Sequence, residues 1–158
     1  MDFSDFVAAR RASLVRSAVL LGCAQPDAED LVQTALLRCY RHWRRVERAD
    51  QPDAYVYQVL VNALHDARAR RWTGEAPTDD LPDTAHDPDL TTGLAVRRAL
   101  AAMSREHREV LVLRFYADLS ERATADALRL PVGTVKSRTA RALAALAADE
   151  NLGSHDAH

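Results

Sequence analysis

Basic and hydroxyl side chains gather in one short run near the C-terminus of this 158-residue chain. Arginine and lysine donate hydrogen bonds to guanine edges, and hydroxyl groups serve phosphates or bases of either kind. The run lies in the second of two short helices, joined by a tight turn, that the sequence predicts across Leu119–Leu146 (LSERATADALRLPVGTVKSRTARALAAL). This is the outline of a helix-turn-helix, whose second helix enters the DNA major groove. We therefore expect duplex DNA to be contacted by Thr134, Lys136, Ser137, Arg138 and Arg141. The alternative is an ordinary helical hairpin with a charged, solvated face.

The elements around this run are predicted to be helices. Ser120 is a good N-cap for the first helix of the motif, and Gly133 or Thr134 can start the second. Upstream, Ser104 can cap a further helix, and the C-terminal block begins near Leu90. Alternation of apolar and polar residues typical of strands is absent from the sequence, so the predicted fold class is all-α.

The N-terminal block reads as three or four helices with apolar residues at helical spacing. Asp27 is expected to cap the second helix, and Pro52 suits the first turn of the third. The predicted buried stripe of that third helix consists of Tyr55, Val56, Val59, Leu60, Ala63 and Leu64.

The charge distribution separates the two blocks. The net charge of −2 argues by itself against nucleic-acid binding, but residues 73–89 hold six acidic side chains and no basic one. With Pro77, Pro82 and Pro88 and no apolar periodicity, this strip reads as a flexible acidic linker. Fully extended, it could span roughly 55–60 Å, so the blocks could lie far apart on a large partner. We expect domains at residues 1–72 and 90–150, with a disordered tail at 151–158.

Several classes of protein are disfavoured. The chain has no run of 18 apolar residues and its N-terminus lacks a signal-peptide core, so we expect a cytoplasmic protein without membrane insertion. No catalytic constellation and no phosphate-binding glycine loop are visible, which argues against an enzyme. We expect no cofactor and no metal, and we interpret the histidines of the tail, His155 and His158, as part of a floppy terminus.

Three segments together resemble one family. Leu130–Leu146 (LPVGTVKSRTARALAAL) is similar to the region-4 helix-turn-helix of bacterial RNA polymerase sigma factors of the extracytoplasmic-function (ECF) group. Ala28–Val46 (AEDLVQTALLRCYRHWRRV) resembles the region-2 helix of that family, and Pro52–Arg71 resembles its following helix. The order of the blocks and the acidic linker also match, and the resemblance covers about residues 3–148, in the style of actinobacterial members.

The resemblance implies partners and roles. It implies that Glu29, Asp30 and Gln33 bind core RNA polymerase, although these charges could simply complement the helix dipole. It implies that a loop at Glu47–Asp53 captures a flipped base of the promoter. It also implies that the minus-thirty-five element is read by the second helix of the motif, and that an anti-sigma factor is a partner. The minus-ten element would be handled by Asn62, Arg68, Arg70 and Arg71. For Asn62 the alternative is a satisfied polar residue at the edge of the apolar stripe.

Two readings stay open beside this one. A conventional helix-turn-helix regulator would bind duplex DNA without polymerase, and an interaction module would sequester a partner without touching DNA. Arg38, Arg41, Arg45 and Arg48 follow a 3-4-3 spacing, which fits either DNA backbone contacts or a solvated helix face. Two positions depart from the family: Arg129 stands where glycine is frequent, and Ala123 where glutamate is frequent.

Overall fold

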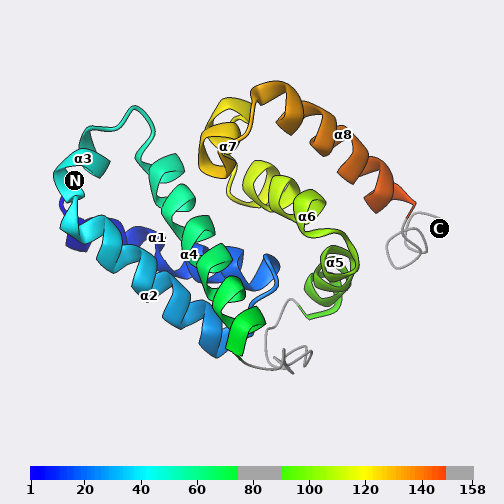
Figure 1. Cartoon of the computed structure of the whole chain (residues 1–158), viewed down its shortest axis with the longest axis horizontal. Coiled ribbons are helices and arrows are strands. Elements are labelled where there is room, and N and C mark those ends of the chain that lie inside the picture. Colours follow the sequence, from blue (N-terminus) through cyan, green and yellow to red (C-terminus); the bar gives the residue numbers. More distant parts are fainter. Residues whose placement is uncertain (75–89, 149–158) are drawn as a thin grey trace.

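The computed structural model describes residues 1–74 and 90–148, and this part of the chain is built from helices without a strand, as the sequence predicts (Figure 1). The N-terminal half contains α1 (Phe3–Leu20), α2 (Gln25–Arg41), α3 (Trp43–Arg48) and α4 (Pro52–Gly74). The C-terminal half contains α5 (Leu90–Ala102), α6 (Arg105–Leu111), a π-helical turn η1 (Val112–Tyr116), α7 (Glu121–Leu128) and α8 (Val132–Ala147). The predicted tail and nearly all of the predicted linker lie outside the described residues, although the first two linker residues, 73 and 74, extend α4.

The starts of the helices follow local chemistry. The Ser104 and Ser120 hydroxyls accept hydrogen bonds from the backbone N–H of His107 and Ala123, so both predicted N-caps are confirmed. The predicted Asp27 cap is wrong, because the N-cap of α2 is Ala24, three residues earlier, and it makes no side-chain hydrogen bond. Pro26 explains the shift: it lacks a backbone N–H and is tolerated in the first turn, where such groups are unpaired in any case.

The N-terminal half closes around aromatic and aliphatic side chains. Phe3 makes edge contacts with Tyr40 and Trp43, and Phe6 lies against Trp43, so the start of α1 is fixed to the α2–α3 corner. In the interior, the Ser17 and Tyr57 hydroxyls are 2.7 Å apart and join α1 to α4. This pairing satisfies two polar groups that burial would otherwise penalise.

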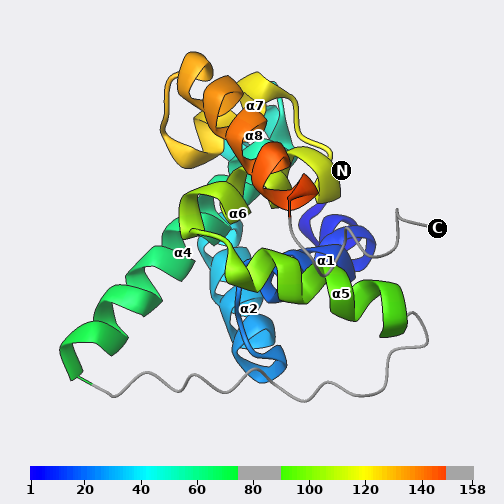
Figure 2. The same ribbon diagram turned by 90° about the vertical axis from the view of Figure 1, so that its right-hand side faces the viewer.

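The two halves pack directly against each other. α4 lies beside α7, and α1 contacts both η1 and α5 (Figures 1 and 2). One contiguous apolar core includes residues of α1, α2 and α4 together with Leu113, Leu119, Ala123 and Ala127 of the C-terminal half. The sequence allowed the two blocks to lie far apart, whereas in this structure of the free chain they share a core.

Candidate nucleic-acid and polymerase interfaces

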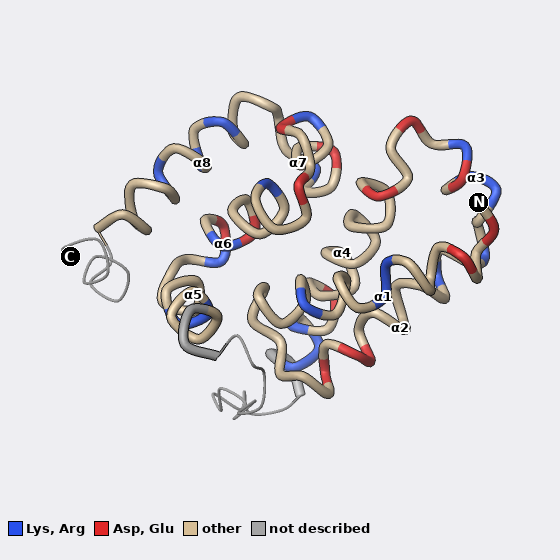
Figure 3. Tube along the Cα trace, turned by 180° about the vertical axis from the view of Figure 1, so that it is seen from behind, with Lys and Arg blue, Asp and Glu red and all other residues tan. Residues whose placement is uncertain are grey.

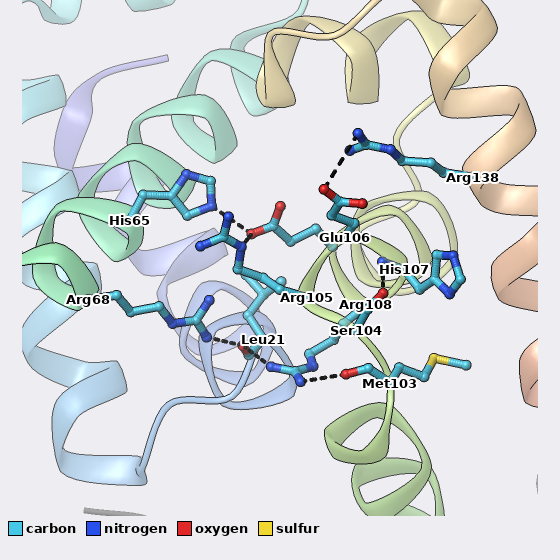
Figure 4. Close-up of polar contacts among 11 residues, drawn as sticks. Leu21, His65, Arg68, Met103, Ser104, Arg105, Glu106, His107, Arg108 and Arg138 are labelled. Atoms are coloured by element: carbon cyan, nitrogen blue, oxygen red, sulfur yellow. Dashed lines mark hydrogen bonds and ion pairs between the residues drawn. The ribbon is translucent and has the colours of Figure 1, made fainter. Parts of the chain in front are cut away.

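The basic run lies on α8, the second helix of a helix-turn-helix formed with α7. Lys136, Ser137 and Arg141 are exposed, while Thr134 and Arg138 are half-buried. Basic side chains occur along α8 without any acidic one (Figure 3). Arg138 Nη2 lies 3.8 Å from Glu106 Oε1, so the guanidinium forms an ion pair with a carboxylate of α6 (Figure 4). The helix starts at Val132, one residue before the predicted range, with Pro131 as its N-cap.

The turn before α8 contains the residue where the family often has glycine. Arg129 ends α7 in the left-handed conformation, with φ 56° and ψ 46°. This is the conformation that glycine adopts most readily. A non-glycine residue in it costs about 1 kcal/mol, and the chain tolerates that cost at Arg129. The N–H of Leu130 donates to the carbonyl of Ala125 at 2.9 Å, which pairs one of the last carbonyls of α7. The departure at Arg129 therefore leaves the motif intact.

On α4, the four residues assigned to the minus-ten element are in different environments. Arg70 and Arg71 are exposed, and Arg71 is paired with Asp27 at 2.8 Å. Asn62 is half-buried. Arg68 is also half-buried and donates to the carbonyl of Leu21 at 2.6 Å, and burial is the main cause that lowers the pKa of its guanidinium. Arg68 therefore supports the fold and can reach a phosphate only if it leaves Leu21.

A cleft of about 890 Å³ lies between the two halves. One wall comes from the segment before α4 and its first turns, including Asp50, Gln51 and Tyr55, which overlaps the predicted base-capturing loop. The other wall comes from α7 and the turn after it, including Arg122 and Arg129. The loop expected to hold a flipped base thus faces the helix-turn-helix across open space.

The acidic run on α2 is displayed on the surface. Glu29, Asp30 and Gln33 are all exposed. Leu37 and Tyr40 continue along α2 toward its C-terminus with relative exposures of 57% and 60%, large values for apolar side chains. Their spacing of four and seven residues from Gln33 places both side chains on the same helix face as Gln33.

The arginine row of the N-terminal half is broken. α2 ends at Arg41 and α3 begins at Trp43, because His42 leaves the helical conformation with φ −127° and ψ 33°. The single helix face predicted for Arg38, Arg41, Arg45 and Arg48 is therefore wrong. Arg38 lies 3.5 Å from Asp66 of α4, while Arg45 and Arg48 line a pocket that also includes Tyr55.

Each half of the chain matches a different region of the same protein family. Residues 7–73 match the family described as sigma-70 region 2, and residues 93–146 match sigma-70, region 4. The chain is 38% identical over 150 residues to the RNA polymerase sigma-E factor of Streptomyces coelicolor, covering 92% of this chain and 84% of that protein. It is 32% identical over 143 residues to the ECF RNA polymerase sigma factor SigL of Mycobacterium tuberculosis, covering 85% and 81%.

A solved structure has the same fold. The sigma factor RpoE of Bartonella quintana, crystallised in complex with the anti-sigma factor NepR, superimposes with a TM-score of 0.76 at 24% identity, covering 92% of this chain and 94% of that one. Among the described residues, no helix is long and apolar enough to cross a bilayer.

Proposed function

The chain belongs to the ECF group of sigma-70 family RNA polymerase sigma factors, and we propose which of its surfaces carry out each step of transcription initiation. A sigma factor binds core RNA polymerase and directs it to promoters. The observation that supports our assignment best is the separation of charge. An exposed acidic face on α2 and a helix α8 whose charged residues are all basic lie on different halves of one chain.

The acidic face of α2 is proposed to dock on core polymerase. Glu29, Asp30 and Gln33 offer side-chain oxygens that can accept charge-assisted hydrogen bonds from arginines of a partner helix. Leu37 and Tyr40, exposed farther along the helix, supply apolar area of the kind that forms the centre of protein interfaces. The surface therefore offers hydrogen-bond acceptors that can select an arginine-bearing partner, together with apolar area that the partner can bury.

The minus-ten element is proposed to be held by α4 and the preceding loop. Arg70 and Arg71 would contact phosphates, which gives affinity without sequence readout. Asn62 would contact an unstacked base, and Arg68 would join only after releasing Leu21. Residues 49–51 and Tyr55 line the inter-half cleft, which gives a flipped base a place to enter.

The minus-thirty-five element is proposed to be read by α8 in the major groove. Lys136, Arg138 and Arg141 would contact guanine edges or phosphates, and Thr134 and Ser137 would position the helix. The protein is then a transcription factor subunit rather than an enzyme, and it works in the cytoplasm. An anti-sigma factor is proposed as a further partner, as in the complex of the Bartonella structure.

Reconstitution with core polymerase on a genomic promoter library, followed by run-off mapping, tests the function. We expect start sites that depend on the chain and share a minus-ten and a minus-thirty-five element. A conventional regulator would instead bind its DNA sites without polymerase. An interaction module would give no start sites, and its activity would not respond to substitution of Arg138 or Arg141.

A further inference from the structure

The loop between α3 and α4, which is proposed to receive a flipped base, is short. Only residues 49–51 lie outside the two helices. At one end of the loop, the N–H of Ala49 donates to the carbonyl of Val46 of α3 at 3.1 Å. At the other end, the carbonyl of Gln51 accepts from the N–H of Tyr55 of α4 at 3.2 Å. Because three residues have little slack, the shape of the loop depends on where α3 and α4 lie relative to each other.

One face of α1 contacts both helices that flank this loop. Four side chains share the face, at successive intervals of three, four and seven residues: Phe3, Phe6, Arg10 and Ser17. The two aromatic residues contact the start of α3. Arg10 and Ser17, farther along α1, each make a polar contact with α4. α1 therefore spans the loop and fixes the helices on its two sides.

The position of α3 depends on α1 because α3 cannot hold itself in place. It has six residues and a single buried side chain, that of Val46. Helices of this length are not stable without tertiary contacts. Trp43, the first residue of α3, supplies such contacts, with its ring centroid 5.4 Å from that of Phe3 and 5.3 Å from that of Phe6. The start of α1 thus sets where α3 lies.

Arg10 makes the contact with α4 that is nearest to the loop. Its Nε lies 3.1 Å from Asp53 Oδ1 and its Nη2 lies 3.2 Å from Asp53 Oδ2, so two N–H groups donate to the two oxygens of one carboxylate. Asp53 is the second residue of α4 and the last residue of the segment predicted to capture the base. A bidentate pair of this kind fixes the orientation of the two groups as well as their separation.

This pair contributes to geometry more than to stability. The side chains of Arg10 and Asp53 are 48% and 44% exposed, and exposed ion pairs add little to the free energy of unfolding. The buried pair of Ser17 and Tyr57 and the apolar core hold the same two helices together without it. Loss of the Arg10–Asp53 pair should therefore leave the half folded and let the first turn of α4 and the loop move more freely.

We propose that Arg10 is a positioning residue for strand opening at the minus-ten element. Through Asp53 it holds the start of α4 at the distance from α3 at which residues 49–51 can accept a flipped base. A loop that already has its binding geometry loses less conformational freedom when the base enters, so capture is more favourable. This inference rests on the proposed function, and it assigns a role to a residue of α1 that acts through another residue.

The competing explanation is a direct contact between Arg10 and a promoter phosphate. A phosphate contact needs a positive charge, which lysine also supplies, and it does not need Asp53. The positioning role needs the planar guanidinium, because lysine cannot form a bidentate pair with a carboxylate. It also needs the carboxylate of Asp53. Substitutions on both sides of the pair therefore distinguish the two explanations.

The test uses holoenzyme assembled from the full-length chain and core polymerase. The promoter fragment carries 2-aminopurine in the non-template strand of the minus-ten element, so that its fluorescence reports the rate of strand opening. The variants are Arg10→Ala, Arg10→Lys, Asp53→Asn and the double variant Arg10→Ala with Asp53→Asn. Arg11→Ala is the matched control, because Arg11 is the next exposed arginine of α1 and forms no ion pair within the described residues. Titration gives the affinity for core polymerase, and circular dichroism checks folding.

We expect each of the three single variants to open the promoter about three- to tenfold more slowly than the wild type, the range for one lost hydrogen bond. The double variant should be no slower than the slower of its two single variants, because both remove the same pair. The affinity for core polymerase should be unchanged in all of them, and Arg11→Ala should open the promoter at the wild-type rate.

Two results would overturn the proposal. One is opening at the wild-type rate by folded Arg10→Ala and Asp53→Asn variants. The other is a wild-type rate for Arg10→Lys beside a slow Arg10→Ala, which would show that Arg10 acts on DNA through its charge. If the wild-type holoenzyme opens no promoter at all, the proposed function is contradicted, and this result is distinct from a wild type that opens and variants that match it.

Discussion

The two helices proposed to read DNA are built differently. On α8 most of the basic and hydroxyl side chains are exposed to solvent. Arg138 makes one weak ion pair, at 3.8 Å from Glu106. On α4 the exposed arginines are at the end of the helix, while Asn62 is half-buried and Arg68 is engaged with Leu21. Base edges in duplex DNA can be read by side chains that are already exposed in the free protein. A melted strand forms only when the duplex opens, so the side chains that bind it need to be accessible only then. The difference indicates that α8 is ready to bind in the free chain and that α4 is not.

The largest effect should come from removing the arginines of α8. Arg138→Ala and Arg141→Ala should each cost about 1–3 kcal/mol of promoter binding if they contact bases. The loss should depend on the minus-thirty-five sequence, because base contacts specify and phosphate contacts do not. Run-off transcription from promoters with intact and altered minus-thirty-five elements measures it. Equal activity of wild type and double variant on the intact promoter would contradict the assignment of α8.

Substitutions of two arginines of α4 should have different effects, one on the stability of the fold and the other on DNA binding. Arg68→Gln removes a charged hydrogen bond to Leu21 and should lower the free energy of unfolding by about 1–2 kcal/mol. Arg70 is exposed, so Arg70→Gln should cost less stability than Arg68→Gln. It should instead weaken holoenzyme binding to promoters and reduce the salt slope by about 1. Urea unfolding and salt-dependent binding measure the two effects, and the reverse pattern would show that Arg68 is the more important DNA contact.

Arg129→Gly probes the turn that positions α8. It removes the strain of a left-handed non-glycine residue, partly offset by the freedom that glycine gains in the unfolded chain. We expect a net stabilisation of about 0.5 kcal/mol in thermal unfolding. Arg122→Gly, inside α7, is the control and should destabilise by about 0.5–1 kcal/mol. A destabilising Arg129→Gly would mean that the arginine side chain itself holds the turn.

The smallest effect concerns the pair between Arg138 and Glu106. The Glu106 side chain is 60% exposed, and exposed ion pairs contribute about 0–1 kcal/mol. Glu106→Gln should therefore change stability by less than about 1 kcal/mol and slightly strengthen binding to the minus-thirty-five element by freeing Arg138. Glu121→Gln, which removes a charge from the first turn of α7, is the control. A large loss of promoter binding would show that Glu106 positions Arg138 for the DNA rather than competing for it.

Local features of the fold were predictable because the residues that cause them are adjacent in sequence. Ser104 and Ser120 cap their helices, and Pro52 begins α4, as expected from cap and proline preferences. The break at His42 was missed, since it coincides with the tertiary packing of Trp43 against Phe3 and Phe6 rather than with a local signal.

The packing of the halves was the main feature that the sequence did not predict. The predicted stripe of α4 omitted Tyr57 and Val61, which are 6% and 1% exposed. Together with the predicted stripe they leave α4 apolar around much of its circumference, as in a helix covered on more than one side. The hydrogen bond from Arg108 to the Leu21 carbonyl could not be found in this way, because it joins positions 87 residues apart. The polymerase and minus-ten assignments depend on family resemblance, the α8 assignment depends on the helix-turn-helix pattern, and all of them stay predictions.

Footprinting of one promoter fragment with the chain alone, core polymerase alone and both together tests the account most directly. Because α4 is not ready to bind in the free chain, the minus-ten and minus-thirty-five elements should be protected together only when both proteins are present. Specific protection of both elements by the chain alone would contradict the account.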